Sequence, residues 1–224
     1  MTPVLPPSAV KHFYDRFGAR QDRQGFYEDA ALDDLVAHAA FATAGSIVEF
    51  GCGTGRFAER ILGQTPSATY VGFDVSTTMV ELARGRMARF GDRAQIRQLD
   101  PGTVSLPLPD HGADRLLSTY VLDLFPEADI ATFLREAHRL LAPRGLLGLV
   151  SLTHGDTLIP RLVAQLWGAV HRLRPQLVGG CRPVRLRSYC DGARWDVVHH
   201  RVLARWGISS EILVARPLDK REDG

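Results

Sequence analysis

The residues best suited to hold a polar ligand lie close together near position 50. Glu49 is followed by Gly51, Gly53 and Gly55, three glycines spaced by two. Glycine lets the backbone turn sharply with no Cβ in the way, and it lets peptide N–H groups approach a polar ligand at a helix N-terminus. A dinucleotide fingerprint needs its third glycine five residues after the first, where this chain has Arg56. The spacing therefore favours a different polar-ligand loop, the alternative being a glycine-rich turn with no ligand.

A second acidic residue, Asp74, ends the apolar run 69–74 and lies 23 residues after Gly51. In a doubly wound sheet, ligands sit beyond the carboxyl ends of the strands, near the switch in strand order. A carboxylate at that edge can accept hydrogen bonds from both hydroxyls of a ribose. We therefore expect Asp74 to bind a sugar, and the alternative is an ordinary turn or N-cap residue.

Taken together, these motifs resemble the class I S-adenosylmethionine (SAM)-dependent methyltransferases. The loop from Glu49 to Gly55 is similar to their nucleoside-binding loop. The segment 13–17 is similar to the Tyr-Asp element that opens many small-molecule and quinone or lipid methyltransferases, of the type 11 or ubiquinone–menaquinone-biosynthesis-like kind. The resemblance implies SAM as cofactor and S-adenosylhomocysteine as product. The cofactor-binding residues that it implies are Tyr14, Glu49, Gly51, Cys52, Gly53, Asp74, Val75, Met79, Asp100, Pro101 and Ser118.

Two of these residues have roles that the resemblance specifies further. Tyr14 lies on an N-terminal helix that closes over the cofactor, and it reaches the methionine carboxylate. Packing of the aromatic stripe of that helix onto the core remains the alternative, above all for Phe13 and Phe17. Asp100 occupies the position from which, by the same resemblance, such enzymes hydrogen-bond the adenine amino group. Family members often have Ala or Leu after this aspartate, so Pro101 departs from the pattern.

Three titratable residues are candidates for catalysis: His154, Asp123 and Tyr120. Methyl transfer from a sulfonium has a neutral leaving group, so the protein mainly aligns the donor with the acceptor and excludes water. A general base is needed only where the acceptor must lose a proton. His154 is the first choice because its ordinary pKa suits proton transfer near neutrality, and a structural hydrogen bond is the alternative role for it and for Asp123. No metal is expected, since neighbours such as His199 and His200 on a strand point to opposite faces.

The elements that must position these residues alternate between strands and helices. Parallel strands are expected at 47–50, 69–74, 94–100, 113–118 and 146–152, with helices at 56–62, 130–141 and 157–174. The segments 195–203 and 208–215 read as an antiparallel pair, which distinguishes a methyltransferase sheet from an all-parallel dinucleotide sheet. The expected fold class is α/β: a doubly wound, seven-stranded, mostly parallel sheet with a C-terminal antiparallel hairpin, the Rossmann-like methyltransferase fold, with a helical cap.

Length and composition suit one domain, 1–224, with an N-terminal helical cap at 8–42 and an inserted cap segment at 155–190 that form the acceptor pocket. Hydrophobic content of 45% and charged content of 23% are ordinary for a soluble protein. There is no secretory pattern, no apolar window long enough for a membrane span, and no disulfide or metal spacing among three cysteines. These features predict a cytoplasmic protein.

Positive charge gathers in the C-terminal third of the chain. From Gly155 to Gly207 there are nine Arg and three Asp, although the whole chain carries only +2. Aromatic residues are not interleaved with the basic ones, so nucleic acid is not an expected partner. We expect the apolar side of helix 157–174, with Leu162, Leu166, Trp167, Val170 and Leu173, to face the core or cover the substrate. Contact with a membrane surface is a less favoured alternative.

The first functional hypothesis is a SAM-dependent methyltransferase that acts on an O-, N- or C-nucleophile of a small-molecule acceptor, as a monomer or homodimer. One alternative is methylation of a membrane-borne quinone or phospholipid. Another is a SAM-binding protein that catalyses nothing. A nicotinamide-dependent dehydrogenase is disfavoured both by Arg56 and by the terminal hairpin.

Overall fold

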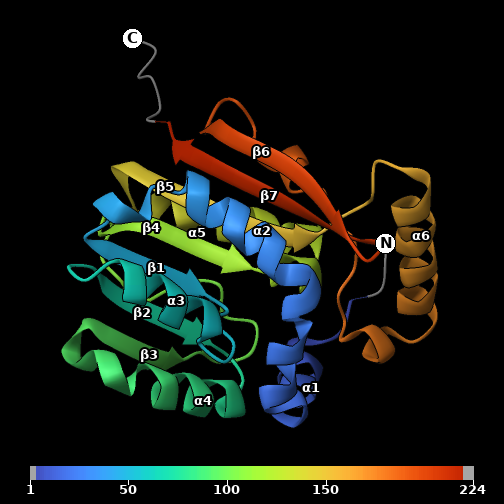
Figure 1. The fold of residues 1–224 in the computed structure, drawn as a ribbon, viewed down its shortest axis with the longest axis horizontal. Helices are drawn as coiled ribbons and strands as arrows, with labels where there is room; N and C mark the ends of the chain where they lie inside the picture. Colours follow the sequence, from blue (N-terminus) through green and yellow to red (C-terminus); the bar gives the residue numbers. More distant parts are fainter. Residues whose placement is uncertain (1–3, 219–224) are drawn as a thin grey trace.

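A seven-stranded sheet runs through the computed structural model, which describes residues 4–218 (Figure 1). The strand order is β3-β2-β1-β4-β5-β7-β6. The first five strands are parallel where they pair, while β7 is antiparallel to both β5 and β6. The strands are β1 (Ser46–Phe50), β2 (Thr69–Asp74), β3 (Ala94–Gln98), β4 (Ala113–Thr119), β5 (Leu141–Leu152), β6 (Trp195–Arg205) and β7 (Ile208–Pro217). The predicted fold class is confirmed.

Helices cover both faces of this sheet because neighbouring strand residues point to opposite sides. In β1, Ile47 packs into a core shared with helices α2, α3 and α4, whereas Val48 packs into a second core with α5. The helices are α1 (Pro7–Phe17), α2 (Gly25–His38), α3 (Arg56–Gln64), α4 (Thr77–Met87), α5 (Glu127–Leu140) and α6 (Leu158–Leu173). Short 3₁₀ turns are η1 (Gly18–Gln24), η2 (Phe41–Thr43), η3 (Ala88–Arg93), η4 (Leu122–Leu124), η5 (Pro175–Val178) and η6 (Leu186–Ser188).

Strand boundaries differ from the sequence prediction by one or two residues in five strands and by five residues at the start of β5. β5 begins at Leu141 rather than Leu146, because α5 passes directly into the strand and Leu141 already pairs with Ala113. Residues 142–145, which the sequence prediction leaves between the helix and the strand, lie within β5, beside a shift in its register with β4. β3 ends at Gln98, two residues earlier than predicted, so Asp100 lies beyond the strand.

The predicted burial of the apolar side of α6 is wrong for its three leucines, whereas Trp167 and Val170 are half-buried. Leu162, Leu166 and Leu173 are exposed, and α6 instead packs through a different face that includes Pro160, Ala164 and His171. A helix needs only one buried face, and periodicity alone does not say which face that is. Among the described residues, no helix has both the length and the apolar character to cross a membrane.

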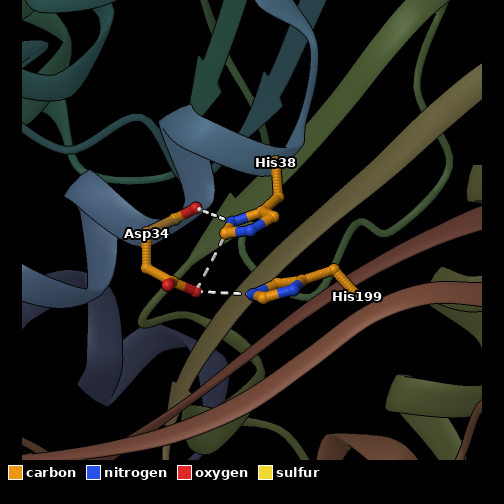
Figure 2. A group of neighbouring side chains, drawn as sticks. All are labelled: Asp34, His38 and His199. Atoms are coloured by element: carbon orange, nitrogen blue, oxygen red, sulfur yellow. Dashed lines mark hydrogen bonds and ion pairs between the residues drawn. The ribbon is translucent and has the colours of Figure 1, made fainter.

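The cap helix α2 is fastened to β6 by a group of polar side chains around Asp34 (Figure 2). Asp34 accepts hydrogen bonds from His199 Nε2 at 2.6 Å and from Arg201 Nη1 at 2.9 Å, although Asp34 itself is buried. Burial would raise the pKa of Asp34, but the bonds from His199 and Arg201 outweigh it and hold that pKa below its ordinary value. The ring of His38 stacks on His199 with centroids 3.6 Å apart.

Replacing this carboxylate should loosen the cap. Asp34→Asn keeps the shape but removes the charge, and we expect it to lower the free energy of unfolding by about 1.5–3 kcal/mol, as for hydrogen bonds to charged partners. Urea unfolding measures the effect. Asp33→Asn is the matched control, because the adjacent Asp33 makes only an exposed ion pair with Arg60 and should change stability by less than about 0.5 kcal/mol. Equal effects of the two variants would contradict a fastening role for Asp34.

Candidate active site

A cavity of about 310 Å³ lies at the carboxyl ends of β1, β2 and β4. Its wall includes Gly51 after β1, Asp74 at the end of β2 and Thr119 at the end of β4. The cap contributes Tyr14 from α1 and Gln21 from η1. β1 has β2 on one side and β4 on the other, so the strand order reverses at this point. Doubly wound sheets bind ligands where the order reverses.

The loop between β1 and α3 has the backbone conformation that its glycines allow. Gly51, Gly53 and Gly55 all have positive φ, at +76°, +52° and +77°. A Cβ on Gly51 would lie 2.2 Å from Val121, and one on Gly53 would lie 2.8 Å from Gln21. Gly51 N–H and Cys52 N–H both donate to the Phe73 carbonyl, which ties the loop to β2. The loop therefore needs glycine for close approach as well as for its turn.

Asp74 joins this loop to the helix that follows β2. Its Oδ2 accepts from Gly53 N–H at 2.9 Å, and its Oδ1 accepts from Ser76 N–H at 2.8 Å. Burial raises the pKa of Asp74 to about 6, against the lowering effect of these backbone bonds. A carboxylate has about four acceptor sites, so Asp74 keeps capacity for donors that enter the cavity.

A smaller hollow adjoins the cavity and shares Gln21, Gly51, Gly53 and Tyr120 with it. Glu49 lies there with its carboxylate hydrogen-bonded by the Tyr70 hydroxyl at 2.5 Å, and burial raises the pKa of Glu49 to about 7. Buried Glu28 and half-buried Arg56 also line this hollow.

Those two groups form an ion pair. Arg56 donates to Glu28 at 3.0 Å and also bonds the more exposed Asp29. Burial raises the pKa of Glu28 to about 7, although Arg56 lowers it. The hollow thus combines a guanidinium, which donates hydrogen bonds, with carboxyl groups whose pKa values are about 7. This combination suits a zwitterionic amino-acid group, which carries both a carboxylate and an ammonium.

The structure brings together most of the residues expected to bind a cofactor. The cavity wall contains Tyr14, Gly51, Gly53, Asp74, Val75 and Met79, and the smaller hollow contains Glu49 and Cys52. Three others line neither space: Asp100, Pro101 and Ser118.

The reason differs among those three. Asp100 and Pro101 are exposed, while their neighbours Leu99 and Gly102 line the cavity, so the chain at this point presents its other side to the ligand. Ser118 is fully buried in β4, and the next residue, Thr119, lines the cavity.

Of the three catalytic candidates, Tyr120 alone lines the cavity. Its hydroxyl lies 2.8 Å from Ser210 Oγ, and burial raises the pKa of Tyr120 above its ordinary value. Asp123 is fully buried, accepts from Leu152 N–H at 3.4 Å, and has a pKa raised by burial to about 7. His154 is exposed on the loop after β5, and burial of part of its ring lowers its pKa.

Gln21 is a site residue that the sequence interpretation did not identify. Its Oε1 is buried without a hydrogen-bond partner, and it lies over Gly53 in both spaces. A buried acceptor without a hydrogen-bond partner costs free energy, so a ligand that donates a hydrogen bond to Gln21 Oε1 would be favoured here. The only sequence signal was its place in the short segment between α1 and α2, where periodicity says nothing about side-chain direction.

A cluster outside the cavity has atoms of the kind that bind metal ions: Asp34, His38 and His199 (Figure 2). Their geometry does not converge on an ion. The two imidazole rings are stacked with an interplanar angle of 5°, so their in-plane lone pairs cannot point to one centre, and Arg201 already neutralises Asp34. The cluster serves as the link between α2 and β6.

Comparison with known proteins supplies a family context for this site. A methyltransferase-domain family model matches residues 47–145. The demethylmenaquinone methyltransferase of Thermus thermophilus is 32% identical over 187 residues, covering 76% of this chain and 82% of that protein. Other curated relatives are longer, and the chain spans 48% and 59% of the length of two of them.

Solved structures show the same fold at low identity. The geranyl diphosphate C-methyltransferase of Streptomyces coelicolor superposes with a TM-score of 0.68 at 13% identity, covering 85% of this chain and 79% of that one. The [4+2]-cyclase SpnF superposes with a TM-score of 0.60 at 18% identity, covering 84% and 80%. The fold therefore hosts more than one chemistry, and activity must be argued from the site.

The close approach at Gly51 can be tested by adding one methyl group. Gly51→Ala combines a positive φ with overlap against Val121, and we expect a loss of about 2–4 kcal/mol in the free energy of unfolding. Gly63→Ala is the control, because Gly63 lies in α3 with open space around it and should be stabilised by up to about 1 kcal/mol. Denaturant unfolding of both variants measures the difference, and a Gly51→Ala protein as stable as the control would refute the crowding argument.

Proposed function

This chain belongs to the class I SAM-dependent methyltransferases, and from that premise we propose that it transfers a methyl group from SAM to a small, largely apolar acceptor. The observation that carries the proposal is the direct bond between Gly53 N–H and Asp74 Oδ2 in the wall of one cavity. This bond supports the proposal, because the glycine loop and the Asp74 carboxylate are then close enough to contact one nucleoside.

The residues present fit such a cofactor. Asp74 keeps free acceptor capacity for two ribose hydroxyls, and Val75 and Met79 supply apolar wall beside it. Gln21 Oε1 lacks a partner beside Gly53, where it would accept from the cofactor's ammonium group. The hollow with Glu49 and Arg56 would hold the rest of the amino-acid end. Asp100 has no part in this proposal, because it lies outside both spaces.

When bound, SAM supplies an electrophilic methyl group on a sulfonium whose departing thioether is neutral. The contribution of the protein is alignment and exclusion of water. Much of the remaining wall is apolar, with Leu124 and Phe125 after β4 and Val10 and Leu5 from the N-terminal segment. These side chains favour an apolar acceptor and cover it from solvent.

Tyr120 orients the acceptor in this proposal. Because burial raises its pKa, Tyr120 stays a neutral phenol at physiological pH and donates or accepts a hydrogen bond without acting as a base. His154 takes no part, since it lies outside the cavity. Asp123 acts only through its neighbours, because its carboxylate is buried behind the wall.

The alternative is a protein that binds SAM without transferring its methyl group, or that uses the fold for other chemistry, as the SpnF neighbour shows is feasible. Isothermal titration with SAM and S-adenosylhomocysteine separates binding from non-binding. Release of S-adenosylhomocysteine in the presence of apolar acceptors then separates transfer from mere binding. Failure to bind SAM at millimolar concentration would refute the proposal outright.

Removing the Asp74 carboxylate should weaken SAM binding. We expect Asp74→Ala to cost about 1.5–3 kcal/mol in affinity, the range for hydrogen bonds to a charged group. Titration calorimetry measures the loss, with a thermal melt to verify folding. His154→Ala is the matched control and should leave the Kd of SAM and the turnover unchanged. An unaltered Kd in the Asp74 variant would show that the ribose lies elsewhere.

The pH dependence of binding should carry the signature of the same group. Ribose hydroxyls donate to the ionised carboxylate, so SAM prefers the deprotonated form, whose pKa is about 6 in the free protein. Affinity should be level at pH 7.5 and fall roughly tenfold by pH 5, because each unit below the pKa costs up to a factor of ten.

The control for this titration is Asp74→Asn, which cannot ionise. Glu28 and Glu49 also titrate near pH 7 and remain in that variant, so only the part of the pH dependence that Asp74→Asn lacks belongs to Asp74. Identical pH profiles in the two proteins would assign the effect to the glutamates instead.

A further inference from the structure

Exposed apolar side chains are concentrated at one end of the molecule. In the described part of the chain, nine large hydrophobic residues are exposed, and seven of them belong to α6, the η5 turn after it, or the turn between β6 and β7. Leu173 is 83% exposed and Trp206 is 82% exposed. Scattered exposed hydrophobics need no explanation, but a gathered set marks an interaction surface.

On α6 these side chains form a continuous stripe. Leu158, Leu162, Leu166 and Leu173 follow one another at spacings of four, four and seven residues, which is the repeat of one helix face. The helix already has a buried side that includes Ala164 and His171. The stripe is therefore a second apolar face, and the folding of this chain leaves it uncovered.

The turn between β6 and β7 extends the stripe beyond the helix. Gly207 lies beside Val163 and Ile159, as the close distances from its Cβ position show. Trp206, the residue before it, is thus held next to the N-terminal half of α6, with its indole in solvent. Figure 1 shows this turn adjoining α6 at the end of the sheet away from the C-terminus.

The charge around the stripe is mainly positive, with exposed Asp156 just before α6 as the nearest acidic residue in sequence. Between residues 157 and 190 there are six Arg and no Asp or Glu. Arg161, Arg172 and Arg174 are exposed on and directly after α6. On the helix wheel Arg161 and Arg172 fall together, between the leucine stripe and the buried side.

We propose that α6 and the β6–β7 turn form a docking surface for anionic phospholipid membranes, with α6 lying in the plane of the interface. Leucines and a tryptophan on one face with arginines beside them are the composition of such helices, and Trp prefers the headgroup region. The 16-residue α6 is too short to span a bilayer.

A second copy of this chain suits the surface less well. A two-fold contact through the stripe would bring the arginines of both copies together without acidic partners from this segment. A membrane of anionic lipids instead supplies the complementary charge. The surface also adjoins the cavity: Gly180, seven residues after α6 ends, lies against Leu5 and Leu124 of the cavity wall. Docking does not depend on methyl transfer, but it would place an apolar acceptor near its binding site.

The test is flotation of the full chain with two kinds of vesicle, one of phosphatidylcholine alone and one with a third of phosphatidylglycerol. Binding to the anionic vesicles should be stronger by roughly tenfold or more and should weaken with added salt. The double variant L162S/L166S should lose roughly tenfold or more of this binding, since two apolar side chains no longer enter the interface. Tryptophan fluorescence of the wild-type protein should shift to the blue with anionic vesicles, and Trp206→Phe should lose the shift, because Trp167 and Trp195 also emit.

Val198→Ser is the matched control, because Val198 is an exposed apolar residue on β6, seven residues before that strand ends at the turn, and it should bind vesicles as the wild type does. Because Leu162 and Leu166 are exposed, their variant should also keep its melting temperature and its Kd for SAM, which separates this test from that of the proposed function. Absent vesicle binding by the wild type, or equal binding by all three proteins, would overturn the proposal. The proposal would also be overturned if sedimentation showed a dimer that L162S/L166S abolishes and the wild type did not bind vesicles.

Discussion

The site depends on one half-buried carboxylate, that of Asp74 at the end of β2. Asp74 bonds the glycine loop through Gly53 and the start of α4 through Ser76, so two loops that follow different strands share one anchor. These contacts hold the carboxylate at the cavity wall, where its partial removal from water raises its pKa more than the bonds lower it. A ligand that donates hydrogen bonds to Asp74 offsets the free-energy cost of burying its charge. Binding in the cavity would therefore also stabilise the two loops that Asp74 joins.

The cap is attached to the same anchor region by polar contacts. Asp15 on α1 accepts from Ser76 Oγ at 2.7 Å, and Asp22 on η1 accepts from Thr54 Oγ1 and from Arg86. These bonds bring Gln21 over Gly53. Since α2 is also tied to β6 by Asp34, the cap is held at both of its ends, over the cavity and on the far edge of the sheet.

Elements with strong periodicity could be predicted, and side chains on short segments could not. The sequence predicted β2 with its observed bounds and the antiparallel hairpin with bounds close to the observed ones, because buried strands and glycine turns leave local signals. It placed Asp74 for the same reason. Asp100 failed to reach the cavity because the strand ended two residues early, and Gln21 escaped notice because a 3₁₀ segment has no face that periodicity can assign. Long-range partners such as Asp34 and His199 have no local signal at all.

The helix α6 shows where an amphipathic pattern stops being informative. Its residues repeat at helical spacing on two sides, and only tertiary packing decides that the side with Ala164 meets the hairpin while the leucine stripe meets solvent. A chain that needed the stripe for its own core would have turned it inward, since burying several leucines outweighs most polar contacts. That the fold leaves it outside, beside a tryptophan and among arginines, means that the free energy of its burial is available to a partner. The cavity wall next to Gly180 is where such a partner would meet the chemistry of the site.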